Sequence, residues 1–136
     1  MNALEMLLGS DRVEKRQEKK VKIRRLSPKG KEPVVFTLQS IGWGRVAEIR
    51  KLGDERAPLH ILLGGVVDPD FKNTALQEKY GAATPAELVE KLLLPGEIED
   101  LAREIEKLSG YRTVTLEEIK KNRLRRPRTE PDALPL

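Results

Sequence analysis

Two consecutive amphipathic helices, separated by a proline, constrain most strongly what this chain can fold into. The tetrapeptide TPAE (84–87) is a capping box, in which the threonine side chain accepts from the helix and the glutamate returns a hydrogen bond to the threonine amide. It predicts a helix over 85–94. Pro95 prevents a smooth continuation but suits the first turn of a new helix, which we expect over 95–109.

The two helices carry one apolar stripe at helical spacing, and this stripe has to be covered. Its cover is either the domain's own core or an apolar face of a partner. Each fully buried leucine or isoleucine is worth roughly 1.5–3 kcal/mol, so a few of them suffice for useful affinity. A domain this small also needs most of its leucines inside, and both interpretations stay open. The candidate partner-binding residues are Leu88, Leu92, Leu93, Ile98, Leu101, Ile105 and Leu108.

A β-hairpin is expected ahead of these helices, over 20–39. Apolar and basic residues alternate in VKIR (21–24), and VVFTL (34–38) has the β-branched and aromatic composition of a strand. A lone hairpin is seldom stable, so helices must cover one of its faces. The predicted fold class is therefore α+β and mainly helical, with an N-terminal β-hairpin or small antiparallel sheet packed on a body of short amphipathic helices.

Shorter helical patterns complete a single folded domain over 20–122. Asp68 and Pro69 offer an N-cap and a first helical residue, and the sequence TLEE (115–118) is a second capping box. The additional predicted helices are 41–52, 58–66, 69–80 and 115–122.

The two ends of the chain differ from this body. Residues 1–19 combine a short leucine-rich helix with a charged connector. A helix of about two turns is marginal in water, so it is expected to dock on its own domain or on a partner. Residues 123–136 hold three prolines and little apolar mass, and we interpret them as a disordered basic tail.

The positive net charge of +4 comes from the two ends of the chain. Residues 1–32 have five positive charges in excess and 112–136 have three, whereas 33–111 have four negative charges in excess. Specific nucleic-acid binding is therefore not expected, since it needs cations held by the folded domain near several phosphates. The alternative is a small nucleic-acid-binding regulator that uses a cluster of basic residues near the C-terminus. This cluster contains no aromatic residue on which bases could stack. Its cations are Lys120, Lys121, Arg123, Arg125, Arg126 and Arg128.

Residues suited to catalysis or metal binding are scarce. The chain has no cysteine, and its one histidine, His60, lies in an apolar run where a half-buried structural role is expected. Asp68 and Asp70 lack the spacing of a calcium loop. We expect no enzyme activity, no metal and no cofactor. The apolar run 59–67 is about half the length of a membrane-spanning helix, so a cytoplasmic protein without a membrane partner is expected.

Several segments at fixed spacing resemble the XkdN-like family of phage tail assembly chaperones. The resemblance extends from the leucine-rich start to about residue 122, and LPGEI followed by LSGY is its most specific part. The segments are VVFT (34–37), GVVDPDFK (65–72), LQEKYG (76–81), TPAELVEKLLLPGEI (84–98) and LSGY (108–111).

The resemblance implies a non-enzymatic protein of a phage or prophage that binds the tape measure protein, keeps it soluble and helps the tail tube to assemble. Its expected location is the cytoplasm of the bacterial host, and it is expected to be absent from the mature tail. Further implied partners are a longer form of itself made by frameshifting, the tail tube protein and copies of itself. A stable structural component of the tail is a further alternative.

Overall fold

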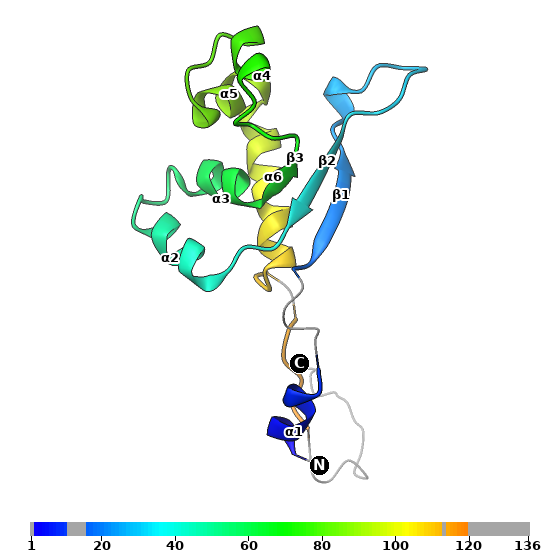
Figure 1. The fold of residues 1–136 in the computed structure, drawn as a ribbon, viewed down its shortest axis with the longest axis vertical. Coiled ribbons are helices and arrows are strands. Elements are labelled where there is room, and N and C mark those ends of the chain that lie inside the picture. The colour runs from blue at the N-terminus through cyan, green and yellow to red at the C-terminus, as the bar shows by residue number, and fades with distance from the viewer. Residues whose placement is uncertain (1, 11–15, 113, 120–136) are drawn as a thin grey trace, which may run out of the picture.

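The computed structural model describes residues 2–10, 16–112 and 114–119. A three-stranded antiparallel sheet packs against short helices (Figure 1), which confirms the predicted α+β, mainly helical fold. The predicted disordered tail, 123–136, lies outside the described residues. The elements are α1 (Ala3–Leu8), β1 (Glu18–Lys22), the 3-10 helix η2 (Arg24–Leu26), β2 (Val35–Gln39), α2 (Trp43–Arg50), α3 (Ala57–Gly65), β3 (Val66–Asp68), α4 (Thr74–Lys79), α5 (Pro85–Leu92) and α6 (Pro95–Leu108).

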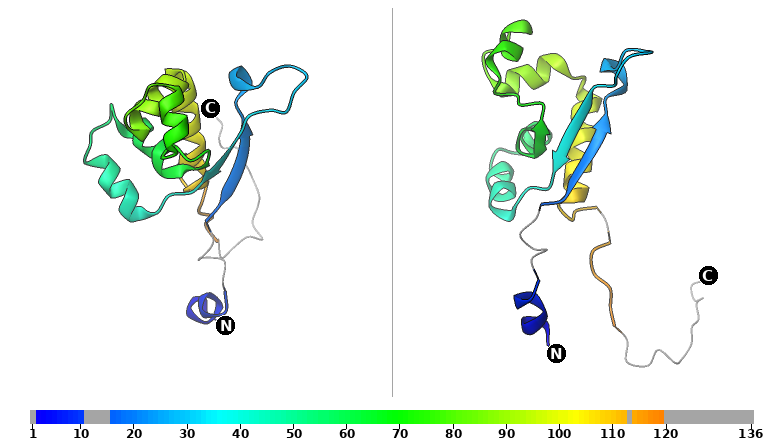
Figure 2. Two further views of the ribbon diagram at one scale, coloured as in Figure 1. Left: turned by 45° about the horizontal axis from the view of Figure 1, so that its top comes forward. Right: turned by 45° about the vertical axis from the view of Figure 1, so that its right-hand side comes forward.

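The sheet has the strand order β1-β2-β3, so β1 is one of its edges. Successive side chains of a strand point to opposite faces, and Phe36 and Leu38 of β2 are both buried on the face that meets the helices. Val21 of β1 stands opposite Phe36 in the register and shares that face. Lys20 and Lys22 of β1 alternate with Val21 and belong to the other face. Figure 2 shows α6 running alongside the strands.

The core depends on a close crossing of α3 and α6. Ile105 of α6 and Leu62 of α3 are fully buried. At Gly65, the last residue of α3, a Cβ atom would lie only 2.5 Å from Cγ2 of Ile105. Glycine is thus required for the two helices to come this close, and the chain continues directly from it into β3.

The predicted helix over 69–80 is wrong in its first part, because α4 begins only at Thr74. Asp68 is not its N-cap, since this residue closes strand β3. The N-cap is Asn73, whose Oδ1 accepts a hydrogen bond from the Leu76 amide at 2.9 Å. Sequence reasoning also missed β3 itself, which has only three residues and follows a helix without a turn.

Phe71 explains why this helix starts late. Its side chain is buried and meets Phe36 of the sheet edge-to-face, with 6.1 Å between the ring centroids. A turn holds it there, in which Oδ1 of Asp70 accepts from the Lys72 amide at 3.0 Å. Packing of one aromatic ring outweighs the helical preference of the flanking residues.

The predicted helix over 115–122 is also wrong as far as it is described. Residues 114–119 have no helical structure, and 120–122 lie outside the described part. Leu116 and Ile119 are exposed, so no packing compensates the cost of nucleating a short helix. The other predicted helices and the hairpin agree with the structure to within two residues at each end.

Helix α1 stands apart from the body of the protein (Figure 1). Asn2 caps it, with Oδ1 accepting from the Glu5 amide at 2.9 Å, and Glu5 returns a bond to the Asn2 amide. Every residue of α1 is exposed, including its leucines. The expected docking is therefore not on the described residues of its own domain, and docking on a partner stays a prediction.

Substituting Gly65 tests the helix crossing. Gly65→Ala places a methyl group against Ile105, and overpacking of this kind costs about 1–3 kcal/mol of unfolding free energy. Gly44→Ala is the matched control, because a Cβ there meets nothing within 4 Å in helix α2, and it should stabilise by up to about 1 kcal/mol. Urea unfolding of both variants measures this, and a Gly65→Ala protein as stable as the parent would contradict the close crossing.

Candidate partner-binding groove

The structure places the seven predicted partner-binding residues in or against the core. Four of them are buried: Leu88, Leu93, Leu101 and Ile105. The other three are partly buried and pack against the core: Leu92, Ile98 and Leu108. In this conformation the stripe covers the protein's own interior, and a role in partner binding stays a prediction. The six cations from Lys120 to Arg128 lie outside the described residues.

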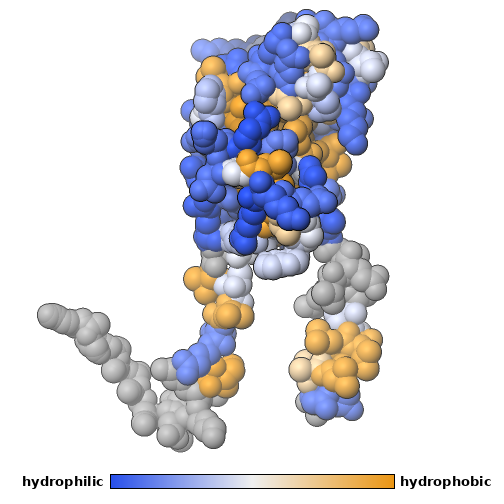
Figure 3. Space-filling model, turned by 90° about the vertical axis from the view of Figure 1, so that its left-hand side faces the viewer, coloured by the Kyte–Doolittle hydropathy of each residue, from blue (hydrophilic) through white to orange (hydrophobic). Residues whose placement is uncertain are grey.

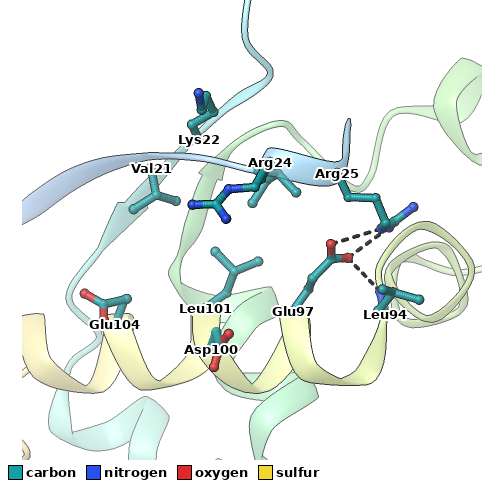
Figure 4. A pocket seen from close by; sticks show the side chains of 10 residues that line it. Val21, Lys22, Arg24, Arg25, Leu94, Glu97, Asp100, Leu101 and Glu104 are labelled. Carbon is teal, nitrogen blue, oxygen red and sulfur yellow. Dashed lines mark hydrogen bonds and ion pairs between the residues drawn. The ribbon is translucent and has the colours of Figure 1, made fainter. Parts of the chain in front are cut away.

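A groove of about 540 Å³ lies between β1–η2 and α6 (Figure 4). Its apolar side chains are Val21 and Ile23 from the hairpin, and Leu94 and Leu101 from the start and middle of α6. Leu101, one of the predicted residues, lies at the bottom. The VKIR alternation in the sequence was the signal for this surface, because alternation turns Val21 and Ile23 toward the same helix.

Ion pairs between the strand side and α6 close both ends of the groove. At one end, Nε and Nη2 of Arg25 donate to the two carboxylate oxygens of Glu97 at 3.0 and 2.8 Å. Arg25 also donates to the Leu92 carbonyl, and Glu97 accepts from the Leu94 amide at the start of α6. At the other end, Nζ of Lys19 lies 2.6 Å from Glu104. The two pairs link the hairpin to the helix at both ends of the groove.

These contacts lower the pKa values of the carboxylates. The Arg25 guanidinium is the main cause for Glu97, with the Leu94 amide adding to it, and burial opposes both. Glu104 has a lowered pKa chiefly because Lys19 donates to it. Both carboxylates therefore stay ionised to a lower pH than an unpaired glutamate, and neither offers a free negative charge to a ligand.

The charge that remains unpaired at the groove is positive. Asp100, its third carboxylate, pairs with Arg103 at 2.9 Å. Lys22 and Arg24 have no ion-pair partner among the residues that the structure describes. In Figure 4 the Arg24 guanidinium lies beside Val21 over the groove, while Lys22 points away from it. The groove thus combines an apolar floor with a cationic margin.

Other exposed apolar side chains lie outside the groove. Trp43, at the start of α2, is 76% exposed, and tryptophan at such a position is a frequent anchor in protein interfaces. The leucines and methionine of α1 form the hydrophobic cluster at the lower right of Figure 3, separate from the body. The surface thus offers several apolar contacts to a protein partner.

The described residues hold no cluster of histidine or acidic side chains suited to a metal ion. His60 is half-buried, and burial together with Arg56 and Arg45 lowers its pKa, so the ring is neutral near pH 7. Within the described part of the chain, the helices are too short or too polar for any to cross a bilayer.

Comparison with known proteins assigns the family. Residues 4–122 match the sequence profile of the phage XkdN-like tail assembly chaperone proteins (TAC), and the chain belongs to this family. The matched range includes α1 from its second residue, the groove and residues 114–119. Among solved structures, the crystal structure of the protein YqbN is similar in fold, with a TM-score of 0.60 and 24% sequence identity over 71% of this chain and 87% of that one. Comparison with curated proteins finds no match.

The Arg25–Glu97 pair should be visible in the pH dependence of stability. A carboxylate whose pKa is lowered by folding stabilises the fold above its ordinary pKa, roughly 4.3 for glutamate, and this contribution is lost as the pH falls through the folded value. Glu97→Gln should therefore reduce stability at neutral pH and flatten the decline in acid.

Urea unfolding between pH 3 and 7 is the measurement for this pair. Glu99→Gln serves as the control, since Glu99 is exposed and no ion pair with it occurs among the described residues. Parallel profiles for the parent, Glu97→Gln and Glu99→Gln would contradict the assigned role of the pair.

Proposed function

We propose that this protein binds the tape measure protein, keeps it soluble and helps the tail tube to assemble, without enzymatic activity. Membership of a phage tail assembly chaperone family supports a role in tail assembly. The observation that supports the finer proposal is the open apolar groove between β1–η2 and α6. A chaperone for a long helical client needs such a surface to cover an apolar stripe.

The dimensions of the groove suit two turns of a client helix. Glu97 and Glu104, which mark its ends, are seven residues apart on α6, and this corresponds to about 10 Å of helix. Two side chains at i and i+4 of a client span about 6 Å and fit between the end pairs. Each buried aliphatic side chain contributes roughly 1.5–3 kcal/mol before association costs are subtracted.

One groove therefore binds weakly, and several copies along one long client supply the avidity. Each copy bound to a client raises the local concentration of the next contact, as in other multivalent systems. Trp43 and α1 add apolar contacts beyond the groove. Of the predicted residues, Leu101 takes part through the groove floor, and the partly buried Leu92, Ile98 and Leu108 are further candidate contacts.

The remaining partners and the location complete the proposal. Copies of this chain, a longer frameshifted form and the tail tube protein are proposed partners during assembly in the host cytoplasm. A chaperone leaves the finished particle, whereas a structural component stays in it. Mass spectrometry of purified tails separates the two, and this chain should be absent from them.

Co-expression with the tape measure gene tests the function and the groove together. The parent protein should raise the soluble fraction of the client and co-purify with it. A client that is equally soluble without the protein, and that does not co-purify, would overturn the proposed function.

Leu94→Asp is the informative variant for the groove. It places a charge at the groove margin, while aspartate remains a good N-cap for α6. Leu52→Asp is the matched control, because Leu52 is 51% exposed, Leu94 is 52% exposed, and Leu52 lies outside the groove. We expect Leu94→Asp to lower the co-purified client at least several-fold and Leu52→Asp to behave as the parent. Equal recovery with both variants would exclude the groove as the client site.

A further inference from the structure

The segment after the body is the most exposed apolar stretch that the structure describes. Residues 114–119, which we call the arm, have the sequence VTLEEI, and Val114, Leu116 and Ile119 are 91%, 87% and 79% exposed. Two glutamates lie among these apolar residues. Side chains of this kind are normally covered by a partner surface.

The groove has the properties that complement this arm. Its floor is apolar, its own carboxylates are all engaged in ion pairs, and the unpaired charge that lies over it is that of Arg24. In an extended segment alternate side chains share a face, so Val114, Leu116 and Glu118 point to one side and Glu117 to the other. The same face of the arm can then make apolar contacts with the groove floor and an ion pair between Glu118 and Arg24.

Strand β1 adds a backbone site next to this floor. It is an edge of the sheet, and in the described residues β2 is the strand paired with it. The lysines of β1 discourage pairing with a second β1, because like charges would face each other. They favour an acidic segment instead, and strand addition at an exposed edge is a common mode of peptide recognition.

The arm of the same molecule does not lie in the groove. Arg112 is held by Glu106 at 2.7 Å, and the Tyr111 amide donates to the Glu106 carbonyl. Glu106 lines the α3 side of α6 together with Pro58, whereas Glu104 lines the groove on the β1 side. Val114, Leu116 and Ile119 stay exposed beyond this attachment, so the groove of the same molecule covers none of them.

We propose that the arm of one copy binds in the groove of a second copy. The arrangement is head-to-tail, so each pair keeps one free arm and one free groove, and further copies can add. This inference rests on the proposed function in one respect, because the groove is also the proposed client site. The arm then occupies this site until a client displaces it. Self-association thereby becomes a means of storing the chaperone and of lining up copies along the client.

Charge reversal on the two sides tests this contact in the purified full-length protein. Sedimentation velocity over a wide concentration range, at low and moderate salt, should detect association of the parent. Arg24→Glu, and separately the double change Glu117→Arg with Glu118→Arg, should each weaken association at least tenfold. Lys72→Glu is the control, since Lys72 is an exposed cation outside the groove, and it should associate as the parent does.

Mixing the two reversed proteins gives the sharpest outcome. Association should return in the mixture, because each groove then meets an arm of opposite charge. Circular dichroism of each variant checks that the fold is retained. A parent protein that stays monomeric, or a mixture that stays dissociated, would overturn the inference. Co-expression with the tape measure gene is read separately, so a monomeric protein that still solubilises the client removes this inference and leaves the proposed function intact.

Discussion

The approach of Gly65 to Ile105 is the contact on which the rest of the structure depends. Because residue 65 has no side chain, α3 can cross α6 at a distance that a methyl group would forbid. The chain leaves Gly65 directly as β3, so the same contact places the third strand beside β2 and the sheet over α6. One face of α6 is thereby committed to the core through Ala102 and Ile105, and another is left to face the hairpin.

The groove follows from that arrangement. Strand β1 is an edge of the sheet, and two ion pairs join the β1–η2 segment to α6 at the ends of the groove. Partly exposed pairs contribute little stability individually, so they contribute mainly to the local geometry of the groove. The same pairs neutralise the acidic groups of α6 locally. A body that is acidic over residues 33–111 therefore presents a cationic margin at its candidate site.

Local signals in the sequence predicted the elements that are stabilised locally. Thr84 caps α5 as expected, with Oγ1 accepting from the Glu87 amide, although the Glu87 carboxylate returns its bond to the Ala83 amide and not to Thr84. Pro95 separates α5 from α6 at the predicted place. The failures involve contacts between distant segments: Phe71 holds a turn where a helix was expected, and the arm has the residues of a capping box without anything to pack on. The groove itself combines residues from 19–25 with residues from 94–104, and only part of it, the VKIR alternation, is visible in the sequence.

Site-specific crosslinking tests whether the groove contacts the client, as proposed. Since the chain has no cysteine, Leu94→Cys and Leu52→Cys each provide a single labelling site of nearly equal exposure. Each protein, purified and labelled with a short photo-crosslinker, is mixed with the tape measure protein, irradiated and analysed by mass spectrometry. We expect adducts from position 94 to apolar helical segments of the client and few from position 52. Adducts of equal yield at both positions, or none at position 94 while the complex forms, would contradict this expectation.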